Sequence, residues 1–442
     1  MTKSINSVEV DAKMSKPRLS YVTSRRDFCR SAVAVAAGSL LEPLGDTARA
    51  AANDRDRQAR QYLQDILYTR EELESLISGT TPHGEKYHPQ LGWIHADRRT
   101  KHGADNSLVT YRYDATGSRR MIMYRDQPCR INTYGDSFTH CDQVSDGETW
   151  QEVLAAHLIE PVRNYGVGGY SVYQAYLRMV REERKTPAKY IIFNVYSDDH
   201  YRNLHSWRFI RTRRTAAERQ GAWGPPMPFL KVNPATGEFR EYPNPCPTVD
   251  SFSTDLRDID WVVQTFQDDF VLRLTLAHRN ILAGTPERSY SDIKSLAQEH
   301  RFDAKINSSH SLAAAVDSLY TRAGLWASMQ VINKVEEFVA AHGKKVLYVL
   351  SYGGSTGFYR NLESGQRFDQ PFIDFLQQKQ LNYVDLLLAH HRDKAQFNLS
   401  MEDYLKRYYV GHYNLQGNVM QAFAIKDKLV DMLEPTPIPY AS

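Results

Sequence analysis

Ser137 follows Gly135 and Asp136 directly after a predicted strand, residues 130–134, and a predicted helix comes next. In an α/β sheet the carboxyl end of a strand is where ligands bind. A serine hydroxyl at such a point is placed to act as a nucleophile, provided that a base takes its proton. Taken alone, the tripeptide is equally typical of a turn that caps a helix. Its chemistry therefore depends on what the rest of the chain brings to it.

His412 is the histidine best placed to be that base. It stands in a predicted loop shortly before the closing helix, residues 419–433. An imidazole titrates near neutral pH, so it can take a proton and return it. The chain holds 15 histidines, and a surface histidine without a catalytic part is the plainer alternative. The order of the segments lets this loop carry His412 back over Ser137.

Strand-length apolar segments alternate with helical periodicity along most of the chain. The predicted strands are 130–134, 162–165, 189–196, 345–352 and 382–387, and the main helices are 148–158, 172–184 and 419–433. This alternation predicts an α/β fold: a three-layer α/β/α sandwich with a mostly parallel sheet, flavodoxin-like in character. Residues 201–310, rich in proline and aromatic side chains, interrupt the pattern and are interpreted as an insertion.

In this order the motifs resemble the SGNH (GDSL-type) hydrolase superfamily over roughly residues 126–435. Gly135-Asp136-Ser137 resembles the family's first block, which carries the nucleophile. Gly169 matches the glycine of the second block, and His412 matches the histidine of the last. The resemblance implies a serine hydrolase with Ser137 as nucleophile and His412 as base. It also implies an oxyanion hole that includes the backbone N–H groups of Ser137 and Gly169.

The third block departs from the family pattern. Asp198 stands where the family has an asparagine whose side-chain amide donates to the oxyanion. An ionised carboxylate cannot donate a hydrogen bond. Either Asp198 is protonated and completes the oxyanion hole, or it points away and another group donates. Asn194 and Asn203 are the candidates for that second case.

The family's last block also lacks its acid, because Tyr409 stands three residues before His412. Such an acid normally fixes the histidine tautomer and steadies the imidazolium. Asp403 and Asp385 are the candidates to replace it. A backbone carbonyl, or a Ser–His dyad without a third member, are the remaining alternatives.

The first 50 residues resemble a bacterial twin-arginine signal peptide. Arg25 and Arg26 are adjacent, residues 31–41 form a mild apolar run, and residues 48–50 read Ala-Arg-Ala. This order predicts export to the periplasm or the medium. The alternative is a basic tail in front of a cytosolic enzyme.

We therefore expect a signal peptide over 1–50, an N-terminal extension over 51–125 and the hydrolase domain over 126–435, with the insertion at about 201–310. Beyond residue 50 the chain carries 47 basic and 47 acidic residues, which gives no electrostatic case for nucleic acid or an anionic membrane as partner. No apolar run is long enough to predict a transmembrane helix. Export would leave three cysteines, and an odd number argues against a disulfide framework, although a bridge between Cys129 and Cys141 stays open.

The expected reaction is hydrolysis of a short-chain ester, with O-acetyl groups on carbohydrate as the favoured substrate, and it needs neither a cofactor nor a metal. Aromatic side chains of the insertion either line a substrate cleft or form a small core; they are Trp207, Phe209, Trp223 and Phe229. Side chains that can stack on or hydrogen-bond to sugar rings are Tyr201, Asn203, Trp207 and Trp223. The alternatives are an acyltransferase that acts on polysaccharide, a lipase or acylhydrolase, and a binding protein on a retired hydrolase fold. The sequence leaves the oligomeric state open.

Overall fold

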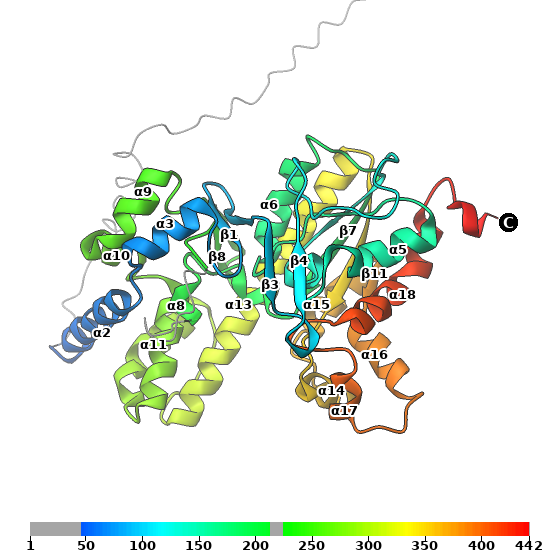
Figure 1. Cartoon of the computed structure of the whole chain (residues 1–442). Helices are drawn as coiled ribbons and strands as arrows, with labels where there is room; N and C mark the ends of the chain where they lie inside the picture. The colour runs from blue at the N-terminus through cyan, green and yellow to red at the C-terminus, as the bar shows by residue number, and fades with distance from the viewer. Residues whose placement is uncertain (1–45, 213–223, 442) are drawn as a thin grey trace, which may run out of the picture. The chain divides into compact units, whose positions relative to one another are not determined.

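Five parallel strands form the central sheet of the computed structural model, which describes residues 46–212 and 224–441 (Figure 1). Their order across the sheet is β11-β10-β7-β5-β6, and every neighbouring pair is parallel. The bounds are β5 Ile131–Tyr134, β6 Arg163–Asn164, β7 Tyr190–Tyr196, β10 Lys345–Ser351 and β11 Tyr383–Asp385. The predicted α/β class and parallel sheet are confirmed.

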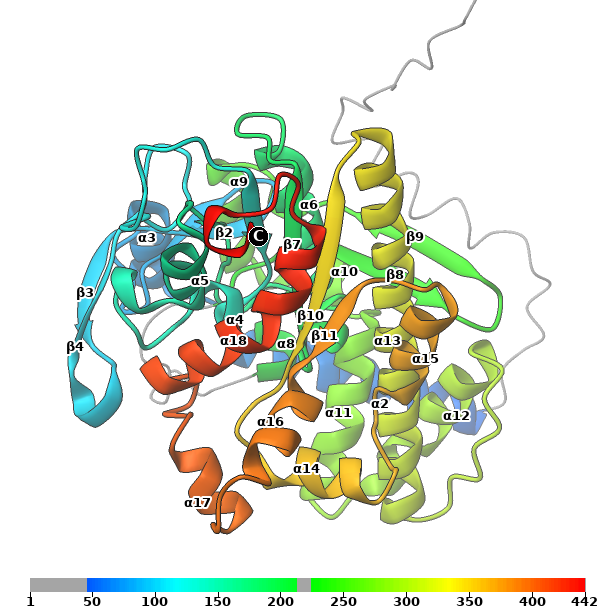
Figure 2. The ribbon, with the colours of Figure 1, turned by 90° about the vertical axis from the view of Figure 1, so that its right-hand side faces the viewer.

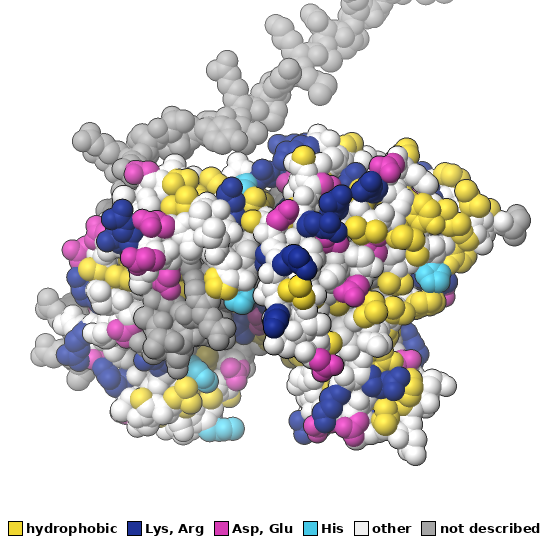
Figure 3. Space-filling model, viewed as in Figure 1, with side chains coloured by type: hydrophobic (Ala, Val, Ile, Leu, Met, Phe, Trp, Pro, Cys, Tyr) yellow, Lys and Arg dark blue, Asp and Glu magenta, His cyan; other side chains and the backbone are white. Residues whose placement is uncertain are grey.

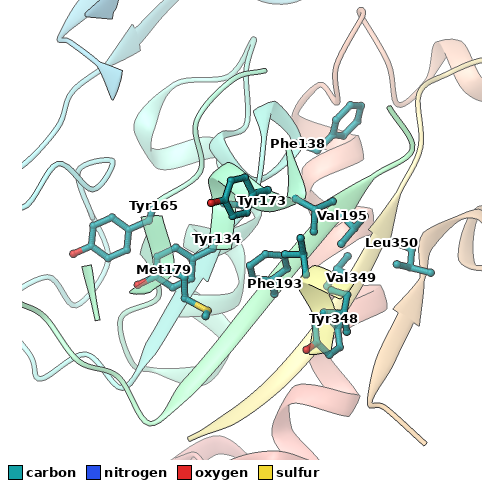
Figure 4. Close-up of a cluster of buried hydrophobic side chains, with 14 of the residues drawn as sticks. Tyr134, Phe138, Tyr165, Tyr173, Met179, Phe193, Val195, Tyr348, Val349 and Leu350 are labelled. Atoms are coloured by element: carbon teal, nitrogen blue, oxygen red, sulfur yellow. The ribbon is translucent and has the colours of Figure 1, made fainter. Parts of the chain in front are cut away.

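Helices cover both faces of this sheet, which makes the predicted three layers (Figure 2). One face carries α5 (Trp150–Leu158), α16 (Leu386–Lys394) and α18 (Leu415–Met432), and the other carries α6 (Val172–Glu182), α13 (Ser309–Ala341) and α15 (Gln370–Gln378). Strand β7 is buried along nearly its whole length, as its apolar run predicts. Tyr134, Phe193 and Tyr348 lie in register on three adjacent strands and form part of the core (Figure 4).

The segment between β7 and β10 builds a second, smaller core of its own. It contains α7 (Asp199–Arg202), α8 (Phe209–Thr212), β8 (Phe229–Asn233), β9 (Glu238–Tyr242), α9 (Val249–Thr254), α10 (Ile259–Phe266), α11 (Phe270–Leu282) and α12 (Tyr290–Glu299). Apolar side chains of α11, α12 and the first half of α13 pack together there.

The aromatic side chains expected in a sugar-binding cleft are mostly part of the core. Trp207 is fully buried, with its ring centroid 5.7 Å from that of Tyr68, and Phe209 packs beside both. Phe229 is also buried, whereas Trp223 lies outside the described residues. Of the two alternatives for the insertion's aromatic residues, the core is correct for these three side chains.

Residues before β5 fold against the sheet domain as helices and two antiparallel hairpins. The elements are α2 (Asp46–Asp65), α3 (Arg70–Ser78), β1 (Glu85–His88), β2 (Gly92–His95), β3 (Arg98–Lys101) and β4 (Leu108–Tyr111). Strand β3 alternates half-buried and exposed positions, with Arg99 and Lys101 exposed. Figure 3 shows basic side chains on the surface over β3 and β4. The inward side of these hairpins faces the sheet domain.

Most of the predicted signal peptide lies outside the described residues; only residues 46–50, at the start of α2, are included. In the part of the chain that is described, no helix is long and apolar enough to cross a membrane. Cys129, Cys141 and Cys246 are free thiols, so the bridge left open between the first two is not formed.

Candidate active site

Ser137 is the first residue of α4 (Ser137–His140), immediately beyond the carboxyl end of β5. The turn requires glycine at position 135, where φ is +151° and a Cβ atom would collide with Thr139 Oγ1. Asp136 caps the helix by accepting a hydrogen bond from the backbone N–H of Phe138 at 2.9 Å. Ser137 is therefore held rigidly, with only 6% of its surface exposed.

His412 meets Ser137 from a loop 275 residues further along the chain. Its Nε2 lies 2.9 Å from Ser137 Oγ, so the structure brings the two predicted residues into hydrogen-bond contact. The loop is closed by a bond from the backbone N–H of Val410 to the carbonyl of His412 at 2.9 Å. The ring of Phe138 packs against the imidazole, with the two ring centroids 5.2 Å apart.

Gln143, which the sequence analysis did not single out, holds the other side of His412. Its Oε1 accepts the backbone N–H of His412 at 2.6 Å and lies 3.3 Å from Nδ1 of the ring. Its Nε2 donates to the carbonyl of His102 at 3.1 Å, which fixes the orientation of the amide. Because Oε1 can only accept, Nδ1 carries the proton and Nε2 faces Ser137 as an acceptor. That is the tautomer a general base needs.

A negative charge lies close to this histidine although its hydrogen-bond partner is neutral. Asp142 interacts electrostatically with His412, and its Oδ1 lies 2.7 Å from Nδ1 of His140. Burial alone would raise the pKa of Asp142, but His140 and Arg98 outweigh it and hold this pKa well below its usual range. The neighbouring carboxylate therefore stays ionised.

The structure brings neither of the expected acids to His412. Asp403 is exposed on α17 (Met401–Lys406), where it bonds to Ser400 and Lys406. Asp385 caps α16 and forms an ion pair with Arg367 at 2.5 Å. Both carboxylates are engaged elsewhere. The prediction that Asp403 or Asp385 replaces the third acid is therefore wrong.

Tyr409, in the place of the family's acid, anchors the loop instead of contacting the His412 ring. Its hydroxyl donates to the carbonyl of Tyr352 at 3.1 Å, and its oxygen lies 3.1 Å from the hydroxyl oxygen of Tyr413.

Gly169 occupies the expected second side of the site, in the loop that follows β6. Its φ of +79° is a conformation that glycine adopts without strain. Within residues 46–212 and 224–441, no group accepts a hydrogen bond from the backbone N–H of Gly169 or of Ser137. Both N–H groups are available to a developing oxyanion.

Asp198 does not fit the role of a protonated donor. Its carboxylate pairs with Arg202 Nε at 2.9 Å and with Arg211 Nη1 at 2.7 Å. Burial would raise the pKa of Asp198, but the two guanidiniums outweigh it and hold this pKa far below the usual range. The expectation that Asp198 completes the oxyanion hole is therefore corrected, because an ionised carboxylate has no proton to donate.

The two asparagines considered in its place differ from each other. Asn203 accepts from the backbone N–H of Tyr173 at 2.9 Å and donates to Ser328 at 2.8 Å, so its amide is spent on packing α6 and α13. Asn194 is buried in β7, and its amide has no hydrogen-bond partner among the described residues.

Arg202 joins the two segments that carry the free N–H groups. Its Nη1 lies 3.2 Å from Asp136 Oδ2, 3.1 Å from the carbonyl of Tyr170 and 2.6 Å from Asp199 Oδ1. Asp136 precedes Ser137 and Tyr170 follows Gly169, so one guanidinium ties both donors into a single frame. Burial, reinforced by the nearby Asp136 carboxylate, raises the pKa of Asp199 well above its usual range, which reduces the negative charge around this guanidinium.

A serine hydroxyl bonded to an imidazole, at the end of a parallel strand and with two unpaired backbone N–H groups in the adjoining loops, is the set of groups that a serine nucleophile requires. No family model and no curated protein sequence matches the chain. Among solved structures it is similar to a protein from Desulfitobacterium hafniense DCB-2 assigned to the G-D-S-L lipolytic family, at 10% identity over 68% of this chain and 99% of that one, with a TM-score of 0.28. It is also similar to a member of the lipolytic protein G-D-S-L family from Veillonella parvula DSM 2008, at 11% identity over 69% and 100%, with a TM-score of 0.31. The chemistry that this site can perform follows from the contacts and distances between its own residues.

Proposed function

We propose that this chain is a serine hydrolase that cleaves carboxylic esters through an acyl-enzyme. The observation that carries the proposal is the 2.9 Å contact between Ser137 Oγ and His412 Nε2, beside the unpaired N–H groups of Ser137 and Gly169. The site offers a nucleophile, a base in the correct tautomer and an oxyanion hole, which is the set that acyl transfer requires.

The reaction runs in two halves. As Ser137 Oγ attacks the ester carbonyl, its proton passes to His412 Nε2, and the carbonyl oxygen becomes an oxyanion held by the N–H groups of Ser137 and Gly169. The carbon–oxygen bond to the alcohol then breaks, and His412 returns the proton to the departing oxygen. Water, deprotonated by His412, attacks the acyl-enzyme in the same geometry and releases the acid and Ser137.

The test of this function is active-site labelling followed by turnover. A fluorophosphonate should modify the wild-type chain at Ser137 and leave Ser137→Ala unlabelled. Wild-type protein that neither labels nor hydrolyses p-nitrophenyl acetate would be a binding protein on a retired site.

For the substrate we propose short-chain esters, with O-acetyl groups on carbohydrate as the natural class. Support comes from a pocket of about 480 Å³ beside Gly411, the neighbour of His412. Its lining includes Ser355, Thr356, Glu402 and Lys406. The alcohol leaves from the histidine side, because His412 protonates it, so hydroxyl and charged groups there suit a polyhydroxylated leaving group.

A lipase or acylhydrolase is the second candidate, and a different surface favours it. A groove of about 640 Å³ runs along α18 and includes Leu415, Val419, Met420 and Phe423. Phe423 is 48% exposed and Leu415 44%, so an acyl chain laid there would bury apolar surface.

Chain-length dependence separates the two candidates. An acetyl esterase should lose kcat/KM from acetate to octanoate esters, whereas a groove that binds the chain gains roughly 0.8 kcal/mol per buried methylene. Phe423→Ala is the matched variant: it should leave a falling series unchanged and flatten a rising one. Adding a sugar acceptor and analysing the products detects acyl transfer instead of hydrolysis.

We also propose export by the twin-arginine route to the periplasm or the medium, on the basis of Arg25, Arg26 and the segments that follow them. Replacing both arginines with lysine should retain the precursor in the cytoplasm. Normal export of that variant, measured by fractionation, would point to another route or to no signal.

A further inference from the structure

Strand β2 of the N-terminal extension holds the loop that carries Gly169 through three hydrogen bonds. Trp93 Nε1 donates to the carbonyl of Gly168 at 3.0 Å, and the backbone N–H of Gly168 donates to His95 Nε2 at 2.9 Å. The hydroxyl of Tyr170 donates to the carbonyl of Trp93 at 2.5 Å. The residues on both sides of Gly169 are thus bonded to one strand that lies more than 70 positions earlier in the chain.

The bond from Trp93 acts on the oxyanion donor itself. The carbonyl of Gly168 and the N–H of Gly169 belong to the same peptide unit, which is planar and trans, so they point in opposite directions. Fixing the carbonyl therefore fixes the direction of the N–H. A Gly-Gly unit has more conformational freedom than any other, so without such a restraint this peptide plane can rotate.

His95 restrains the preceding peptide plane in the same way. Burial lowers the pKa of His95 well below its usual range, so the ring remains neutral and Nε2 remains an acceptor for Gly168. Apolar packing supports these bonds: Leu91, Trp93, Val167, Tyr170 and Met227 form a small core of their own. The ring of Trp93 meets that of Tyr170 edge-on, at 5.5 Å and 79°.

The second hairpin of the same extension serves the histidine side. The carbonyl of His102 accepts from Gln143 Nε2 at 3.1 Å, and the hydroxyl of Tyr111 accepts from the backbone N–H of Gln143 at 2.8 Å. Gln143 is the residue that sets the His412 tautomer. The extension therefore contacts both the donor and the base through intermediaries.

We propose that Trp93 and His95 are positioning residues that aim the Gly169 N–H at the oxyanion, so that the N-terminal extension is an integral half of the catalytic site. The proposal rests on the proposed hydrolase function. No side chain of β2 touches the reacting atoms in this role; the hairpin acts through the Gly168–Gly169 peptide. A misdirected Gly169 N–H should destabilise the transition state and leave substrate binding unchanged, because the oxyanion exists only in the transition state.

Trp93→Phe is the decisive variant, since it removes the indole N–H and keeps an aromatic ring in the small core. We expect kcat to fall roughly 10- to 100-fold with KM changed less than about twofold, because one oxyanion donor is misdirected without being lost. The affinity for an alkyl boronic acid, which forms a tetrahedral adduct on Ser137, should fall by the same factor. His95→Leu should behave similarly, and His95→Gln should recover most of the activity, because its side-chain oxygen can still accept from Gly168.

Leu177→Ala is the matched control, because Leu177 packs against the same small core from α6 and forms none of the three bonds. It should lower the melting temperature without changing kcat or boronate affinity in the folded range. If Trp93→Phe and His95→Leu also lowered only the melting temperature, the positioning role would be overturned and β2 would be a scaffold. Wild-type protein that shows neither turnover nor boronate binding would overturn the proposed function, and this inference with it.

Discussion

On the His412 side of Ser137 the group that orients the imidazole ring is a neutral amide, whereas the Gly169 side is densely ionic. Gln143 Oε1 contacts His412 at its backbone N–H and at Nδ1. Across the site, Arg202 lies among the carboxylates of Asp136, Asp198 and Asp199. The sequence resemblance predicted an acid beside the histidine and an amide on the oxyanion side. Here the two kinds of group are exchanged.

The exchange separates two tasks that a single aspartate performs elsewhere. A hydrogen bond to Nδ1 selects the tautomer, and an amide oxygen can accept that bond when its orientation is fixed, as the His102 carbonyl fixes the amide of Gln143. A negative charge stabilises an imidazolium in general, and the ionised Asp142 interacts electrostatically with His412. On the oxyanion side, the charges are balanced within the cluster and serve to hold two backbone donors together.

Removing either partner of the contact between Ser137 and His412 should lower activity more than any other substitution. Ser137→Ala and His412→Ala should each lower kcat by at least roughly a thousandfold, and the double variant should be little worse, because the pair acts as a unit. Circular dichroism would verify that each variant is folded. Near-normal turnover by Ser137→Ala, or losses that simply multiply in the double variant, would show that the two residues do not act as a catalytic pair.

Arg202→Met should have the next largest effect and should act on the fold as well as on catalysis. Removing one partner from a buried ion cluster leaves uncompensated carboxylates, which costs about 3–5 kcal/mol of unfolding free energy. Arg202→Lys keeps the charge, but a single ammonium nitrogen cannot contact Asp198 and also Asp136, Tyr170 and Asp199, so it should recover part of the stability and less of kcat. Urea denaturation and steady-state kinetics measure the two quantities. An unchanged kcat in Arg202→Met would show that the ionic frame does not position the donors.

Gln143 tests the histidine side directly. Gln143→Leu should lower kcat by roughly tenfold to a hundredfold, because the ring loses the partner that fixes its tautomer. Gln143→Glu adds a carboxylate, which favours the imidazolium, so the acidic limb of the kcat/KM profile should move to higher pH. A profile that stays in place would mean that Gln143 does not sense the charge on His412.

Strands and helices were predictable from the sequence where a whole segment has the same degree of burial. The run at 189–196 is apolar throughout because β7 is covered on both faces, and the strand was found to within one residue. Ser137 and His412 stand in local motifs, and the contact between them was predicted as well. Gln143 and Trp93 act on partners 269 and 75 residues away, respectively, and neither carries a local signal of such a contact.

The error at Asp198 has the same physical origin. The sequence shows a carboxylate in the place of an amide, but its protonation depends on Arg202 and Arg211. Arg202 lies one helical turn away and was within reach of sequence reasoning, since residues four apart on a helix face each other. Arg211 reaches Asp198 only because the chain folds back after α7, which no pattern in the sequence announces.

Asp198→Asn should affect stability more than catalysis. The carboxylate has a pKa below that of the unfolded chain, so it contributes stability above the unfolded value of about 3.9 and loses it as the pH falls. The variant should therefore unfold with about 1–3 kcal/mol less free energy at pH 7. It should also show a weaker loss of stability between pH 5 and 2. Its kcat should change less than about threefold, with no alkaline limb removed, because an ionised Asp198 donates nothing to the oxyanion. The disappearance of an alkaline limb in this variant would restore the protonated-donor role.

Asp403→Asn and Asp385→Asn should give the smallest effects on catalysis, and they complete the test of the histidine side. Asp403 is exposed and bonds only to neighbours on its own helix among the described residues, so its replacement should leave both kcat and the melting temperature unchanged. Asp385 caps α16 and pairs with Arg367, so Asp385→Asn should lower the melting temperature, because asparagine keeps the cap and loses the ion pair. Neither change should move the acidic limb of the kcat/KM profile, whereas Gln143→Glu should. If Asp403→Asn lowered kcat in a folded protein, that carboxylate would reach His412 during turnover, and the neutral amide would no longer explain how the base is oriented.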